Sequence, residues 1–134
     1  MKIVMTNRGA GKTYLSRLQY NKYHNKQTMF RGIKFDSKKE KDWYMVLLNY
    51  QRNGRIKELE LQKKFELQEG FTDNQGKKQR AITYIADFFY YDTQLKCYVA
   101  EDVKSKATRQ DKVYRIKKKM FMYQYPNILF KEIL

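Results

Sequence analysis

Two adjacent apolar segments constrain the fold of this chain more than any other feature. Residues 81–91 and 95–104 are both rich in β-branched and aromatic side chains, and a short polar turn at residues 92–94 separates them. Such a pair predicts two antiparallel strands of one β-hairpin. The fold must therefore contain a sheet that the rest of the chain covers.

A helix and a strand are predicted before this hairpin. Ser37 and Glu40 form a capping-box pattern at the helix start, and Gly54 suits its end. Four apolar residues at helical spacing would face the sheet: Trp43, Val46, Leu47 and Tyr50. Residues 56–67 then alternate between apolar and polar side chains, which indicates a half-buried strand.

The C-terminal part predicts a second helix and a last strand. Residues 108–111 indicate the helix start, Pro126 ends the helix, and residues 128–133 favour a strand. The buried face of this helix would carry Val113, Ile116, Met120 and Phe121. The order helix, three strands, helix, strand predicts an α/β fold, with a mixed sheet flanked by helices.

The opening segment differs from the rest in its charge. The first acidic residue is Asp36, and eight Lys or Arg residues precede it. We therefore divide the chain into a basic N-terminal arm, residues 1–34, and a domain at residues 35–134. Within the arm, residues 1–5 predict a short strand and residues 13–20 a short helix, followed by an irregular extended segment.

The net charge of +15 on 134 residues limits the class of partner. Self-repulsion of that size destabilises a compact chain, so a polyanion, first of all nucleic acid, is expected. We expect no membrane contact and a cytoplasmic location, because no long apolar segment, signal peptide or lipidation motif is visible. With Cys97 and His24 each alone in the sequence, chemistry must come from carboxylates, lysines and hydroxyls.

Acidic residues occur within the apolar strands of the hairpin, where burying a carboxylate without a partner costs several kcal/mol. Asp87 interrupts one apolar strand, and Glu101 and Asp102 lie in the other, just before Lys104. Because side chains alternate along a strand, Asp102 and Lys104 share one face and Glu101 points to the other. Two carboxylates on neighbouring strands can hold Mg²⁺ with water, and a lysine beside them can stabilise charge on a phosphate. Glu40 can complete this cluster.

Each of these residues also has a purely structural interpretation. Glu40 could only close the capping box, and Asp87 could be a charge that protects a sheet edge. Asp102 and Lys104 could form an ion pair of little energetic value. The occurrence of all three segments in the order helix, strand, strand favours the catalytic interpretation.

The order Glu on a helix, Asp on a strand and Asp-x-Lys on the next strand resembles the PD-(D/E)xK nuclease superfamily of restriction enzymes and Holliday junction resolvases. More closely, residues 32–40 (GIKFDSKKE), 84–88 (YIADF) and 99–104 (VAEDVK) are similar to a family of small phage and prophage proteins catalogued as a domain of unknown function. The similarity covers about residues 20–134. Ala86 stands where the superfamily often has proline.

This resemblance implies a restriction-endonuclease-like fold for residues 35–134 and a Mg²⁺-dependent endonuclease activity, with Mn²⁺ as an alternative ion. Asp87 and Asp102 would be metal ligands, Lys104 the catalytic lysine and Glu40 the helix acid; the reserve ligand is Glu101, in case the register of the second acid is shifted. The implied substrate is DNA, first of all branched DNA such as a Holliday junction. A homodimer would cut it in phage DNA recombination, replication or packaging, in the host cytoplasm if a phage encodes the protein.

Cations outside this cluster are predicted to contact DNA phosphates. They are Arg8, Lys12 and Arg17 in the arm, Lys38 in the first helix, and Arg109, Lys112, Arg115 and Lys118 around the second helix, where Lys117 and Lys119 add to the charge. The structural alternative for each of them is a solvated surface charge.

Residues 6–13 (TNRGAGKT) look like a Walker A loop, which would bind nucleotide phosphates. Thr6 stands where the pattern requires glycine, and an antiparallel hairpin differs from the parallel sheet of nucleotide-hydrolysing domains. A phosphate-binding turn for DNA or a chance glycine-rich turn is favoured. Nucleotide binding, which Lys12→Ala would abolish, and DNA binding without catalysis, in which Lys104→Ala would change no activity, stay as alternatives.

Overall fold

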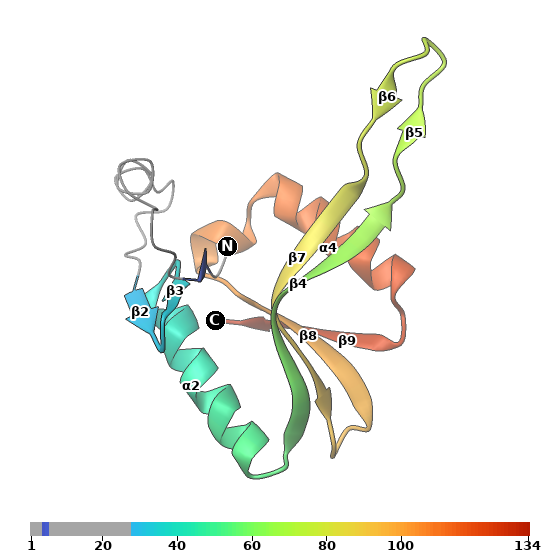
Figure 1. The fold of residues 1–134 in the computed structure, drawn as a ribbon. Helices are drawn as coiled ribbons and strands as arrows, with labels where there is room; N and C mark the ends of the chain where they lie inside the picture. Colours follow the sequence, from blue (N-terminus) through green and yellow to red (C-terminus); the bar gives the residue numbers. More distant parts are fainter. Residues whose placement is uncertain (1–3, 6–27) are drawn as a thin grey trace.

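A four-stranded sheet forms the centre of the protein in the computed structural model, which describes residues 4–5 and 28–134 (Figure 1). Its strands are β4 (Ile56–Gln68), β7 (Ile82–Asp92), β8 (Cys97–Val103) and β9 (Ile128–Ile133), in the order β4-β7-β8-β9. β7 pairs antiparallel with both β4 and β8, and β9 lies parallel to β8. The predicted α/β fold with a mixed sheet is confirmed.

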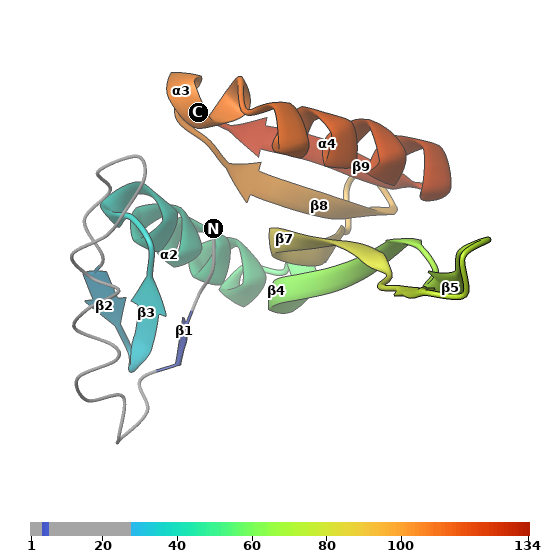
Figure 2. The same ribbon diagram turned by 90° about the horizontal axis from the view of Figure 1, so that it is seen from above.

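Two long helices cover opposite faces of this sheet (Figure 2). α2 (Lys38–Arg52) begins after Ser37, whose hydroxyl accepts a hydrogen bond from the Glu40 N–H at 3.1 Å. It ends just before Gly54, which has a φ of 78°. α4 (Lys112–Gln124) begins after Asp111. Residues 108–111 are the predicted helix start, and only the last of them borders α4, because the one-turn helix α3 (Lys106–Arg109) precedes it. No helix in the described part of the chain is long and apolar enough to cross a membrane.

Each helix packs on its own hydrophobic core, and burial corrects both predicted helix faces. On α2 the buried residues are Glu40, Tyr44 and Leu47, whereas Val46 and Tyr50 are each 36% exposed. On α4 the buried residues are Tyr114 and Phe121, whereas Val113 and Ile116 are each 60% exposed. Both helices offer two apolar stripes, and helical spacing alone does not decide which of them meets the sheet.

A small antiparallel sheet of order β1-β3-β2 lies beside α2 (Figure 1). Its strands are β1 (Val4–Met5), β2 (Thr28–Phe30) and β3 (Ile33–Phe35). The segment predicted as irregular thus ends in a hairpin, whose turn places Arg31 and Gly32 at φ 54° and 75°. The boundary predicted at residues 34 and 35 falls inside β3, while the helix predicted at residues 13–20 lies outside the described residues.

A two-stranded ribbon extends the β4–β7 pair away from the body of the protein (Figure 1). It contains β5 (Phe71–Thr72) and β6 (Lys78–Gln79), which pair with each other in an antiparallel register.

Candidate active site

The central sheet forks midway along β7 and β8. The pairing between these strands ends at Phe88 and Glu101, although β7 continues to pair with β4 and β8 continues to pair with β9. Asp87 and Asp102 are the first residues beyond the last shared pair. The fork therefore places two carboxylates from neighbouring strands at the point where the strands separate.

Asp87 is fully buried. Beyond the fork β7 and β8 no longer pair through their backbones, and the Asp87 carboxylate hydrogen-bonds to β8 instead. Oδ2 accepts a hydrogen bond from the Val103 N–H at 2.9 Å, and Oδ1 accepts one from Gln62 Nε2 at 3.2 Å. Gln62 lies opposite Asp87 on β4, between two regular pairs of the register, and has a φ of 55°. A side chain held in this uncommon backbone region orients the central acid of the fork.

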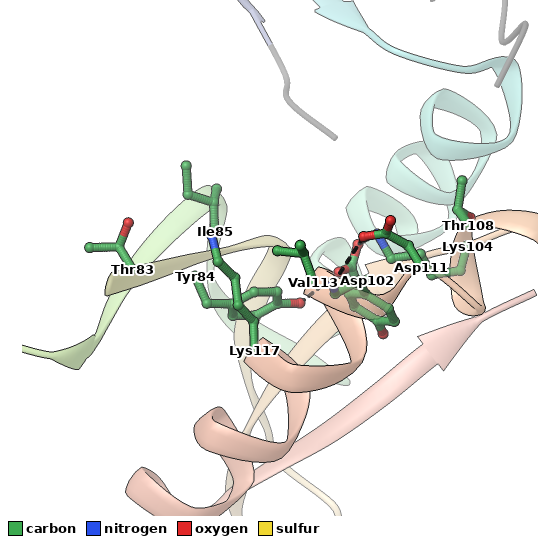
Figure 3. Close-up of a pocket in the computed structure, with 10 residues that line it drawn as sticks. Thr83, Tyr84, Ile85, Asp102, Lys104, Thr108, Asp111, Val113 and Lys117 are labelled. Atoms are coloured by element: carbon green, nitrogen blue, oxygen red, sulfur yellow. Dashed lines mark hydrogen bonds and ion pairs between the residues drawn. The ribbon is translucent and has the colours of Figure 1, made fainter. Parts of the chain in front are cut away.

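Asp102 and Lys104 share one face, as strand alternation predicts. Both are buried; Asp102 Oδ2 accepts a hydrogen bond from the Tyr84 hydroxyl at 2.7 Å, and Oδ1 lies 3.3 Å from Lys104 Nζ (Figure 3). The Lys104 ammonium also lies 4.2 Å from the centroid of the Tyr114 ring. A carboxylate on one side and a ring on the other hold this ammonium in place.

Glu40 reaches the same cluster from the first turn of α2. Its N–H is capped by Ser37, but its carboxylate is buried, and neither oxygen has a hydrogen-bond donor among the described residues. The capping box is thus only half formed, because the Glu40 carboxylate accepts no hydrogen bond from the helix start. The charge of Glu40 helps to raise the pKa of Asp87, so the two carboxyl groups lie within electrostatic range of each other.

The cluster has a local excess of negative charge. Burial above all, together with the charges of Asp102 and Glu40, raises the pKa of Asp87 well above its usual range. Burial likewise raises the pKa of Glu40 to about 7, and the charges of Asp36 and Asp102 add to the effect, while the interaction with Asp87 opposes it. Three carboxyl groups, of which only Asp102 pairs with a lysine, are an arrangement that a divalent cation would stabilise.

The donor set fits Mg²⁺, which usually takes one or two carboxylates and keeps several waters. Asp87 and Asp102 would supply those carboxylates, and the unpartnered oxygens of Glu40 lie beside them. Among residues 4–5 and 28–134, no group of three or more His, Cys, Asp or Glu side chains is already arranged as metal ligands. Water therefore has to complete the coordination of an ion held at the fork.

Glu101, the reserve ligand, belongs to the opposite face of β8. Its two oxygens accept hydrogen bonds from Trp43 Nε1 at 2.7 Å and from the Tyr90 hydroxyl at 2.6 Å. Burial raises the pKa of Glu101, although both of these bonds oppose the change. The structure separates this acid from the fork, and its contacts give it a structural role.

Asp102 and Lys104 face a cleft of about 440 Å³ between the beginning of β7 and the first half of α4 (Figure 3). Asp102 and Lys104 line this cleft together with Thr83 and Ile85 from β7 and Lys117 from α4. An anionic substrate in the cleft would therefore meet two lysines beside the carboxylates.

The predicted DNA-binding cations differ in their exposure and in whether they form an ion pair with an acid of the chain. Lys112 and Arg115 are exposed on α4, and Arg109 is half-buried. Lys118 lies 3.2 Å from a Glu132 oxygen, and Lys38 lies 2.6 Å from an Asp42 oxygen. Arg8, Lys12 and Arg17 lie outside the described residues.

The fold and the fork together define a mixed α/β domain with a buried acidic site and a basic surround. The chain belongs to the family described as a protein of unknown function, DUF1064, which residues 20–134 match. This result confirms the similarity to a domain of unknown function, and the match includes the whole fork. No curated protein and no solved structure matches the chain significantly.

Exchange of Glu40 for Gln should stabilise the metal-free protein at alkaline pH. The folded-state pKa of about 7 lies above the ordinary 4.5, so wild-type stability is lost as pH rises through that interval. At most about 3 kcal/mol is at stake, and Gln removes this cost. Thermal unfolding in EDTA should show the melting temperatures of Glu40→Gln and wild type close at pH 4.5 and about 10 °C apart at pH 8.

Asp42→Asn is the matched control, because Asp42 lies on the same helix and its carboxylate pairs with Lys38 at the surface instead of being buried. It should show no gain that grows with pH. A Glu40→Gln difference that is the same at both pH values would contradict the buried, protonated state of Glu40.

Proposed function

We propose that this protein is a metal-dependent DNA endonuclease that hydrolyses phosphodiester bonds with Mg²⁺, or with Mn²⁺ in its place. The observation that carries the proposal is the fork, where buried Asp87, Asp102 and Lys104 meet Glu40 from the covering helix. The structural alternatives explain these residues poorly. Asp87 is buried and does not protect an exposed edge, and Glu40 does not close its capping box.

Each residue of the fork has a distinct role in this proposal. Asp87 and Asp102 would hold Mg²⁺, which polarises the phosphate and makes a water molecule more acidic. Lys104 donates to a phosphate oxygen and stabilises the charge that develops there during hydrolysis. Gln62 and the Val103 N–H orient Asp87, and the Tyr84 hydroxyl orients Asp102, so the carboxylates need little rearrangement.

DNA as the substrate is supported by charge. The chain carries a net +15, and Lys117 lies in the cleft itself while Lys112 and Arg115 are exposed on the same helix. Lys38 and Lys118 already pair with acids of the chain, so we assign them a smaller share of phosphate binding.

The finer identity of the substrate rests on the resemblance to junction resolvases. We propose branched DNA such as a Holliday junction, cut by a homodimer whose two sites act on two strands. The resemblance also supports a role in phage DNA recombination, replication or packaging, in the cytoplasm of the host cell.

Nucleotide hydrolysis has less support. β1, the strand before the Walker-like residues 6–13, pairs antiparallel with β3, and β7, which carries Asp87, is antiparallel to both neighbours. Nucleotide-hydrolysing domains place these strands in a parallel sheet. The Walker-like residues themselves lie outside the described part of the chain.

Incubation with labelled DNA tests the proposal. Four-way junction, flap, duplex and single-stranded DNA are incubated with Mg²⁺, with Mn²⁺ or with EDTA, using wild type and Asp87→Ala. We expect cleavage by wild type with a metal ion, the junction being cut fastest, and no cleavage by the variant or in EDTA. If wild type cuts no substrate with either ion, the endonuclease proposal is refuted, and DNA binding without cleavage would support the non-catalytic alternative.

A further inference from the structure

The ribbon formed by residues 69–80 lies outside both hydrophobic cores. Every residue in it is exposed except the half-buried Asp73, and even the Phe71 side chain is 49% exposed. None of these residues belongs to either core cluster. Because an isolated hairpin is only marginally stable in water, a ribbon that buries so little apolar area is not explained by the folding of the domain.

The tip of the ribbon is nevertheless ordered by Asp73. Its Oδ1 accepts hydrogen bonds from the N–H groups of Gln75 and Lys77, both at 2.9 Å, and its Oδ2 accepts one from Gln79 Nε2 at 2.9 Å. Gly76 completes the turn with a φ of 81°. The Asp73 charge is therefore used within the turn, and the ribbon is a shaped element rather than a loose loop.

Three exposed cations lie together on the returning strand of the ribbon: Lys77, Lys78 and Arg80. No acid in the described part of the chain forms an ion pair with any of the three. The outgoing strand has Glu69 near its base, so the positive charge of the ribbon gathers on the edge formed by the returning strand. Such an edge suits a polyanion.

The returning strand of the ribbon leads directly into β7, the strand that carries Asp87. Thr83 and Ile85, which lie between the ribbon and Asp87 in the sequence, line the cleft. Residues 77–80 precede Asp87 by seven to ten positions, which is roughly 23–33 Å along an extended strand. Each strand of duplex DNA carries one phosphate per about 3.4 Å of axis. The cations would thus meet DNA about seven to ten base pairs from a phosphate at the fork.

We propose that this ribbon is a DNA-binding finger that grips duplex DNA about one helical turn away from the cleavage site. The major groove admits a two-stranded β-ribbon, and the three cations would contact the phosphates that border it. This inference rests on the proposed function, because it assigns the ribbon to the same DNA that enters the cleft. It adds a second contact region that lies far from the chemistry.

The test compares two triple variants of equal net charge. One is Lys77→Gln, Lys78→Gln, Arg80→Gln in the ribbon. The other is Arg52→Gln, Lys57→Gln, Lys96→Gln, at the end of α2, the start of β4 and the turn between β7 and β8. These segments lie at the opposite end of the molecule from the ribbon (Figure 1). Fluorescence anisotropy in EDTA measures the Kd for a 24-base-pair duplex, a length of about two helical turns, over a range of salt concentrations. The ribbon variant should bind about tenfold more weakly, and its salt slope should fall by about two to three, whereas the control should change little.

A duplex of about six base pairs gives an independent readout, because it is too short to occupy the cleft and the ribbon together. With this short duplex, the difference in Kd between wild type and the ribbon variant should become smaller. Replacement of residues 70–80 by Asn-Gly removes the finger without touching either core and should reproduce the loss on the long duplex, with a melting temperature near that of wild type.

Each outcome decides between the two proposals. If wild type binds and cuts DNA but the ribbon variant keeps the same affinity and salt slope, the finger proposal is overturned and the endonuclease proposal stands. Equal losses in both triple variants would show an effect of net charge alone and would also overturn the finger. If wild type binds no DNA, both proposals fall.

Discussion

Replacing Asp87 by Asn should abolish metal-dependent cleavage and, at the same time, make the metal-free protein more stable. Loss of a metal-holding carboxylate removes several kcal/mol of transition-state stabilisation, which corresponds to a decrease in rate of about 10³-fold or more. Stability should rise because Asp87 is fully buried and its raised pKa makes the charged form costly near neutral pH. Asn keeps the shape and still accepts the hydrogen bond from the Val103 N–H.

Single-turnover cleavage of labelled DNA and thermal unfolding in EDTA at pH 8 measure the two effects. The matched control is Asp92→Asn, a second buried acid on the same strand. The Asp92 carboxylate accepts hydrogen bonds from the N–H groups of Gln94 and Leu95 and lies 3.7 Å from Arg55. This exchange should lower stability and leave cleavage intact. An Asp87→Asn protein that cuts within tenfold of wild type would exclude Asp87 as a metal ligand.

Lys104→Met should lower the rate of cleavage by about 10²–10³-fold without preventing metal binding. Met fills much of the space of the lysine side chain but leaves Asp102 Oδ1 without its cation. The loss of one well-placed donor to a developing negative charge accounts for the decrease. Because Asp102 then has lost its paired ammonium, Mg²⁺ should raise the melting temperature of the variant more than that of wild type.

Lys64→Met on the exposed side of β4 serves as the control and should change neither property. The thermal measurement separates a catalytic lysine from a merely structural one, since it does not depend on cleavage. If Lys104→Met lost its response to Mg²⁺ altogether, the lysine would be needed to build the site rather than to act in it.

The strands of the site were predictable because their signals are local. A two-residue repeat places Asp102 and Lys104 on one face and Glu101 on the other, and the structure has this arrangement. Ser37 and Gly54 mark the ends of α2 through backbone requirements that are also local. Residues 128–133 form β9 with the predicted bounds.

The contacts around the acids were not predictable, because they depend on register and on tertiary packing. Gln62 meets Asp87 only through the pairing of β4 with β7, and Tyr84 meets Asp102 only because the sheet forks. Tyr114 reaches Lys104 from α4, a helix whose buried face the sequence left ambiguous. Glu40 matched a capping box and a cluster acid equally well, and the direction of its side chain separates the two roles.

The ribbon also divides the chain in a way that cuts across the site. Glu40 and Gln62 precede it in the sequence, whereas Asp87, Asp102 and Lys104 follow it. A break within residues 74–77 would leave two pieces, neither of which holds a complete fork, joined by the long pairing of β4 with β7. Under the proposed function, the protein is thus a natural candidate for a split enzyme, in which the reunion of two separately made fragments is the event that creates the site.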